Sequence, residues 1–286
     1  MKRTVLAVLA VSAAMCSFAQ NDTTANEKAD TIKIGGMVII KKGDKRDSSD
    51  TGKNITISDG KKTNVTLSNR KKNKPSNVTT NWWVVDLGFA NLNDNTDYTS
   101  AAAQGIAPGS TKDQFSLRTG KSVNVNVWLF MQRLNLVKHY INLKYGLGVE
   151  LNNYRFENET IRFQKNPTLI VLDASLKDVN KNKLAADYVT VPIMLNINLT
   201  PGRNKGFGFS GGISGGYLYS ARQKFKMGND DKSKTHGNFD LEKWKLSYIG
   251  ELNLGPVKLY GSYATKSMWE RGLDQTPYNL GIRFGN

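Results

Sequence analysis

The sequence predicts an all-β protein, an eight-stranded antiparallel transmembrane β-barrel with a polar N-terminal extension. Three observations predict it. Apolar and polar residues alternate with period two in eight segments after residue 80, the connections between these segments alternate between long and short, and the chain begins with an export signal. Period-two alternation is typical of strands whose two faces meet different surroundings.

Residues 1–19 have the three parts of a secretory signal peptide. In order these are Lys2-Arg3, the apolar run Val5–Ala14, and the small residues Ser17 and Ala19 before the cleavage site. The apolar run is too short for a transmembrane helix, which needs roughly 20 residues. Cleavage removes Cys16, the only cysteine, and so excludes disulfides and thiolate metal sites from the mature chain. A lipid anchor on Cys16 is the alternative, although Met15 fits its pattern poorly.

Residues 20–80 are predicted to be a basic periplasmic segment, largely disordered or with short strands. Basic residues outnumber acidic ones and aromatic residues are absent, so the segment cannot bury a core of its own. It contains three brief alternating pieces and one dipeptide that resembles a hairpin turn: Ile32–Ile34, Ile55–Ile57, Val65–Leu67 and Asp59-Gly60.

Residues 81–286 are predicted to be the barrel domain. Its first four strands are predicted from period-two alternation. Large apolar residues occupy every second position, and small or polar residues lie between them. The apolar positions are Trp83, Val85, Leu87 and Phe89; Val123, Val125, Val127, Leu129 and Met131; Ile141, Leu143, Tyr145, Leu147, Val149 and Leu151; and Val189, Val191, Ile193, Leu195, Ile197 and Leu199.

The last four strands show the same alternation more weakly. Their apolar positions are Phe207, Phe209, Ile213, Tyr217 and Tyr219; Trp244, Leu246, Tyr248, Leu252 and Leu254; Val257, Leu259 and Tyr263; and Tyr278, Leu280, Ile282 and Phe284. The connections between the eight strands are long and short in turn, at residues 91–120, 134–138, 157–184, 200–205, 226–241, 255–256 and 267–276. Outer-membrane barrels alternate in this way, with tight periplasmic turns and longer outer loops.

The composition of the polar face favours a membrane barrel over a soluble β-sandwich, which is the alternative. In a soluble protein the apolar face points inward and long polar residues cover the outside. Here the face opposite the apolar stripes carries glycines, asparagines and serines, which suit the narrow lumen of an eight-stranded barrel. Its glycines are Gly88, Gly146, Gly148, Gly208, Gly212 and Gly216. The apolar stripes therefore face lipid.

Aromatic residues near the strand ends are predicted to form the girdles at the two membrane interfaces. They are Trp83, Tyr140, Tyr188, Tyr217, Tyr219, Trp244, Tyr263, Tyr278 and Phe284, with Phe207 beside them.

Eight charged residues are predicted to face the lumen: Asp86, Lys144, Glu150, Arg222, Lys245, Glu251, Lys258 and Arg283. Charges in so narrow a tube must pair, because an unpaired buried charge costs about 3–5 kcal/mol. A structural network of salt bridges and water that fills the lumen is the favoured interpretation. A path for protons or ions is the other.

Several short sequence motifs of the barrel domain resemble those of the PorT-like outer membrane β-barrel family common in Bacteroidetes. They are Trp82-Trp83 with Asp86-Leu87-Gly88, then Tyr188–Ile193, Gly211–Tyr217 and Leu280–Phe284. The resemblance covers Trp82 to Asn286. It implies the barrel fold and an outer-membrane location, and no catalytic residues are shared by that family. Its best-known member serves a secretion system.

The functional expectation is a non-enzymatic envelope protein with a structural, assembly or surface-interaction role, without cofactor or metal. The formal net charge of +16 would suit nucleic acid, but export leaves lipopolysaccharide, membrane lipid and envelope proteins as partners. A narrow channel is the first alternative. An outer-membrane lipid hydrolase is the second, with His236 near Ser233, Asp230 and Asp231 as its candidate residues, while His139 lies at the periplasmic end.

Overall fold

The computed structural model describes residues 30–34, 37–41, 56–58, 76–176, 179–201, 206–227 and 232–285. The chain divides into two units, Met1–Lys74 and Pro75–Asn286. In the first unit, β1 (Asp30–Ile34), β2 (Met37–Lys41) and β3 (Thr56–Ser58) form an antiparallel sheet. β1 and β3 overlap two of the predicted short pieces, whereas the signal peptide, Val65–Leu67 and Asp59-Gly60 lie outside the described residues.

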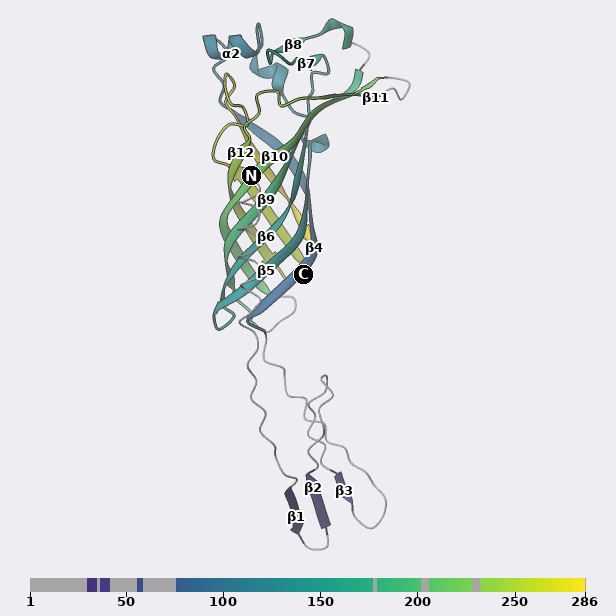
Figure 1. Cartoon of the computed structure of the whole chain (residues 1–286), viewed down its shortest axis with the longest axis vertical. Helices are drawn as coiled ribbons and strands as arrows, with labels where there is room; N and C mark the ends of the chain where they lie inside the picture. Colours follow the sequence, from purple (N-terminus) through teal and green to yellow (C-terminus); the bar gives the residue numbers. More distant parts are fainter. Residues whose placement is uncertain are drawn as a thin grey trace, which may run out of the picture. The chain divides into compact units, whose positions relative to one another are not determined.

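Eight strands of the second unit close into an antiparallel ring (Figure 1). They are β4 (Val78–Asp94), β5 (Val123–Val137), β6 (Ile141–Arg155), β9 (Val179–Asn198), β10 (Phe207–Met227), β12 (Trp244–Leu254), β13 (Val257–Ala264) and β14 (Gln275–Phe284). Each strand pairs with the next one in the ring, and β14 pairs with β4 to close it. The predicted eight-stranded antiparallel barrel is confirmed.

The two ends of the barrel differ as the connection lengths predicted. At the turn end, where β4 begins and β14 ends, the connections are short, and Lys138 and His139 both adopt positive φ in the turn between β5 and β6. At the loop end, the long connections carry elements of their own (Figure 1). These are α2 (Ala101–Ile106), η1 (Lys112–Phe115), η2 (Thr119–Lys121), β7 (Ile161–Phe163), β8 (Ile170–Leu172), η3 (Ala174–Leu176) and β11 (Lys232–His236).

The strands β9 and β10 extend well beyond their apolar stripes, and for β10 this agrees with the predicted connection that begins at residue 226. They have 20 and 21 residues, about twice the 9–11 residues with which a tilted strand crosses a bilayer. β9 begins at Val179, inside the predicted connection 157–184, which the sequence pattern missed because the outward positions there are lysines and not large apolar residues. We call residues 179–187 of β9 and 220–227 of β10 the outer extension. β11 pairs with β10 along it.

Exposure alternates along the strands with the apolar side outward. In β9, Val189, Val191, Ile193 and Leu195 are exposed, while the residues between them are buried in the lumen. Large apolar side chains are likewise exposed on β4, β5, β10, β12, β13 and β14. This is the arrangement expected of a barrel whose outer face meets lipid.

A bulge in β5 corrects one predicted position. The pairing of β5 with β6 shifts between Trp128 and Phe130, so that an extra residue reverses the alternation that follows. Met131 therefore faces the lumen and is buried, whereas the sequence pattern placed it on the lipid face with Leu129.

An apolar core closes the loop end. Aromatic residues from the long connections pack there against inward side chains of the strands, including Tyr154 and Leu184. Phe163 stacks on Trp269 with ring centroids 5.8 Å apart, and Phe239 contacts Phe163 at 5.6 Å. We call this cluster the cap core. It covers the mouth of the barrel with well-packed side chains.

Candidate functional site

Six of the eight predicted charges meet inside the lumen. They come from β4 (Asp86), β6 (Lys144 and Glu150), β12 (Lys245 and Glu251) and β14 (Arg283), and all are buried except Lys144, which is partly buried. Three are acidic and three are basic, so the charges of this set balance. We call them the lumen network.

Arg283 and Asp86 form the centre of the network. The Arg283 Nε and Nη2 atoms donate to the two carboxylate oxygens of Asp86 at 2.6 and 2.8 Å, a bidentate geometry. The indole of Trp128 and the amide of Asn126 donate to the same carboxylate at 2.7 and 3.1 Å. A fully buried carboxylate is thus held by four donated hydrogen bonds.

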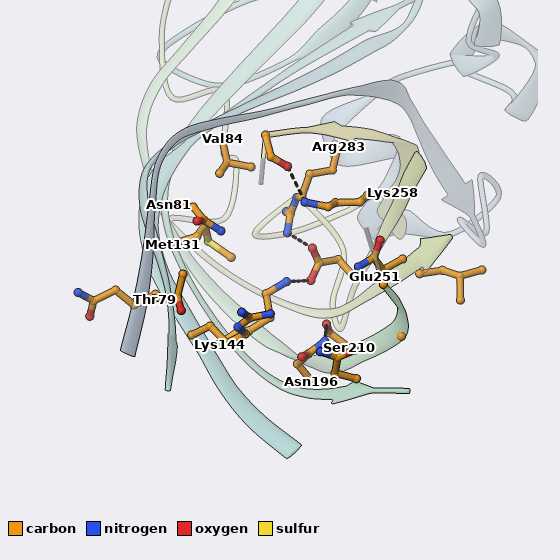
Figure 2. Close-up of a pocket in the computed structure, with 18 residues that line it drawn as sticks. Thr79, Asn81, Val84, Met131, Lys144, Asn196, Ser210, Glu251, Lys258 and Arg283 are labelled. Carbon is orange, nitrogen blue, oxygen red and sulfur yellow. Dashed lines mark hydrogen bonds and ion pairs between the residues drawn. The ribbon is translucent and has the colours of Figure 1, made fainter. Parts of the chain in front are cut away.

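The network continues from Arg283 toward the turn end. Its Nη1 atom donates to Glu251 at 2.5 Å, and the other carboxylate oxygen of Glu251 pairs with Lys144. Figure 2 shows this chain of contacts across the lumen. One arginine therefore joins two acids that lie on strands on either side of it.

Glu150 forms a second centre. It pairs with Lys245, and the amides of Asn152 and Asn279 each donate to it at 3.1 Å. The ammonium of Lys245 also lies 4.5 Å from the ring centroid of Tyr188. Like Asp86, this carboxylate has hydrogen-bond partners on several strands.

Little space remains between these groups. A cavity of about 30 Å³ lies among Asp86, Trp128, Glu150 and Arg283, which is room for about two water molecules. Toward the turn end the lumen widens into a cavity of about 340 Å³, drawn in Figure 2. We call this cavity the vestibule.

The vestibule is lined mainly by polar and basic side chains. Arg133, Lys144, Lys258 and Arg283 contribute to its wall, with Glu251 as the acid among them. Lys258 was predicted to face the lumen, and it does so at the turn end without joining the lumen network. It lines the vestibule, and its ammonium donates to the carbonyl of Gly285 at 2.6 Å.

Arg222 does not face the lumen, contrary to the prediction. The pairing of β10 with β9 shifts between Leu218 and Ser220, and this bulge reverses the alternation beyond it. Gln223 now points inward and is fully buried, while Arg222 faces outward and pairs with Asp187 of β9.

The predicted girdle residues are exposed, with one exception. Trp83, Tyr140, Tyr217, Tyr219, Trp244, Tyr263, Tyr278 and Phe284 are exposed, as is Phe207. Tyr188 is 2 % exposed and lies in the lumen. Its prediction as a girdle residue was wrong, because Tyr188 directly precedes the outward Val189 and no bulge of β9 separates the two residues.

The sequence reasoning missed the neutral partners of the network. Trp128, Asn126, Asn152 and Asn279 all donate to its acids. The sequence did contain the information needed to find them. The three asparagines lie at the polar positions of alternating segments, and Trp128 lies two residues after Asn126, on the same face of β5. Arg133 had no such signal, since the β5 bulge precedes it.

The residues considered for hydrolysis do not converge. Ser233 and His236 lie three positions apart on β11, which puts them on opposite faces of that strand, and His139 lies in a turn at the other end of the barrel. Asp230 and Asp231 lie outside the described residues. Within the part of the chain that the structure describes, no group of three or more His, Cys, Asp or Glu residues could hold a metal ion.

One comparison with known proteins agrees with this architecture. Among the described residues, no helix is long and apolar enough to cross a membrane. A search of curated proteins gave no match. The family model described as "Outer membrane protein beta-barrel domain" matches residues 76–264, from just before β4 to the end of β13, which is more than half of the chain. The chain therefore belongs to the outer membrane protein beta-barrel domain family.

Proposed function

We propose that this outer membrane barrel is closed and non-enzymatic, of the PorT-like type, and that it serves a structural, assembly or surface-interaction role in the cell envelope. The observation that carries the proposal is the obstruction of the lumen at two levels. The balanced lumen network fills the middle of the barrel, and the cap core covers the loop end.

The loop end supports an interaction role. Its long connections share one core instead of lying free, since Phe163, Phe239 and Trp269 come from three of them. A packed cap presents a defined surface to partners, which we propose to be envelope proteins, and the barrel wall contacts lipid and lipopolysaccharide.

With an even number of strands, the first and the last residues of the barrel domain lie on the same side of the membrane. We propose that residues 1–19 are a cleaved signal peptide and that residues 20–80 lie in the periplasm.

Conductance in planar bilayers tests the closed lumen. The full-length protein should insert without steady current, because ions would have to displace Arg283 and Lys245 from buried carboxylates. A general porin reconstituted in the same way is the positive control. A steady current from the wild-type protein would contradict the proposal and favour the narrow channel.

Lipid analysis tests the non-enzymatic role. Cells that carry His236→Ala are expected to have the same envelope lipid profile as cells with the wild-type protein, because His236 is exposed and Ser233 lies on the other face of its strand. A profile altered by this substitution, with protein levels unchanged, would favour the hydrolase instead.

A further inference from the structure

Four basic side chains lie side by side on the outer extension and on the two strands that flank it, β6 and β11. Arg155 of β6 pairs in register with Lys183 of β9, Lys183 pairs with Lys224 of β10, and Lys224 pairs with Lys234 of β11. Residues directly opposite one another in an antiparallel sheet share a face, with Cβ atoms about 4.5–5.5 Å apart. We call these four residues the basic row.

The basic row continues the lipid-facing side of the barrel. Lys183 lies an even number of residues from the exposed Val189, Val191 and Ile193 of β9, so it is on the same face of that strand. The pairing shift between Leu218 and Ser220 inserts a residue in β10 and leaves the alternation of β9 unchanged there. Lys183 lies six residues beyond Val189, or about 20 Å along the strand at about 3.3 Å per residue. The row therefore lies above the apolar belt, on the same face, where the headgroup layer of the outer leaflet would be.

The charges of the basic row are poorly compensated. Burial, followed by the neighbouring Lys181, Arg155 and Lys224, lowers the pKa of Lys183 to about 8. Burial and the neighbouring Arg222 lower the pKa of Lys224 as well. Like charges placed directly opposite one another destabilise a sheet.

Of the two acids nearby, one contacts only Arg155 of the row and the other pairs outside the row. Glu159 lies 3.8 Å from Arg155 but 3.3 Å from Arg118, and Asp187 pairs with Arg222. Among the residues that the structure describes, no acid forms an ion pair with Lys183, Lys224 or Lys234. One side-chain nitrogen of Arg155, Nε, is buried without a hydrogen-bond partner. Three of the four charges therefore have no ion-pair partner among the described residues, and one guanidinium nitrogen donates no hydrogen bond.

We propose that the basic row binds the phosphate groups of an anionic glycolipid of the outer leaflet, of the lipopolysaccharide type. The inference rests on the proposed function, which puts the loop end outside the cell. Four adjacent strands at about 4.8 Å spacing make the row about 14 Å wide, enough for more than one phosphate of a headgroup. The acyl chains of the same lipid would lie along Val189, Val191 and Ile193 below it.

Native mass spectrometry of the full-length protein in micelles tests the inference, with lipopolysaccharide as the probe. The triple variant Lys183→Gln, Lys224→Gln, Lys234→Gln should bind at least tenfold more weakly than the wild type, since each basic residue near an anionic surface contributes measurably. The control Lys112→Gln, Lys121→Gln removes two exposed lysines of the same end and should bind as the wild type does. The triple variant Lys183→Arg, Lys224→Arg, Lys234→Arg should retain binding.

The other arms identify the source of the phosphate. Dephosphorylated lipopolysaccharide and inorganic phosphate should both bind far more weakly than the intact glycolipid. Equal binding of the dephosphorylated form, of phosphatidylglycerol, or of intact lipopolysaccharide to the triple variant would overturn the inference. Each variant is first shown to migrate faster before boiling than after it, as closed barrels do. A wild-type protein without that shift would overturn the proposed function itself, whereas a shifted protein with unselective binding overturns only the basic row.

Discussion

Replacing Arg283 with methionine is expected to lower the free energy of unfolding of the barrel by about 3–5 kcal/mol. The substitution keeps much of the volume but removes the partner of two buried acids, Asp86 and Glu251. Asp86 would retain hydrogen bonds from Trp128 and Asn126 but no ion pair, deep in the lumen. Urea titration of the protein folded in lipid vesicles, followed by tryptophan fluorescence, measures the change.

The control for this prediction is Arg271→Met. Arg271 forms an ion pair of 2.7 Å with Asp240 on an exposed connection, with its side chain 60 % exposed. Such surface pairs contribute about 0–1 kcal/mol. If Arg271→Met and Arg283→Met destabilise the protein equally, the lumen network does not stabilise the barrel in the way described. Adding Asp86→Asn to Arg283→Met should recover part of the loss, because without Arg283 no described residue forms an ion pair with Asp86, whereas Glu251 keeps Lys144.

Replacing Gly212 with valine is expected to prevent the barrel from closing. A Cβ atom at this position would lie 2.0 Å from the carbonyl oxygen of Ile193 and 2.6 Å from the Cα atom of Met194, both backbone atoms of the paired strand. Neither atom can move without breaking the pairing of β10 with β9. Electrophoresis with and without boiling should therefore show no fast-migrating folded form.

The neighbouring glycine gives a matched control on the same strand. Gly211 faces outward, and a Cβ atom there would meet nothing within 4 Å. Gly211→Val should fold as the wild type does, and added apolar surface on the lipid face is compatible with insertion. Loss of the folded form in both variants would indicate a general intolerance of β10, and folding of Gly212→Val would contradict the close approach of the two strands.

The barrel could be predicted because two independent patterns coincide in the sequence. Alternation such as that from Val189 to Leu199 defines strands with two different faces, and the connection lengths define two different ends. The full length of β9 could not be predicted from its apolar stripe. Beyond residue 189 toward the loop end, the outward positions of β9 hold Asp187, Ala185, Lys183 and Lys181, so no apolar stripe marks the strand there.

Bulges explain the predicted positions that the structure corrects on β5 and β10. One extra residue between Leu218 and Ser220 sends Arg222 outward, and the shift after Trp128 sends Met131 inward. A period-two pattern reveals an inserted residue only if the apolar residues shift from odd to even positions, or the reverse, after the insertion. In both strands the residues beyond the bulge are mixed in polarity, so no such change was visible.

The lumen network could be predicted as a set of charges, but its pairings could not. Lys144 and Glu251 lie on strands that are not neighbours in the sheet, and they meet across the lumen. Their meeting depends on the stagger of strands around the closed ring, which no local pattern contains. The cap core was also missed, because most of its aromatic residues, such as Phe163, Phe239 and Trp269, lie in connections without periodicity.

The orientation of the strand faces is tested most directly by depth-dependent quenching along β9. Single cysteines at Val191, Ile193 and Leu195, in a protein without Cys16, are labelled with a fluorophore after folding into vesicles, with Ser175→Cys on the exposed η3 as the aqueous control. Brominated lipids should quench the three β9 positions while iodide does not, and Ser175 should show the reverse. Quenching of the β9 positions by iodide but not by brominated lipid would show that this face meets water and would contradict a membrane barrel.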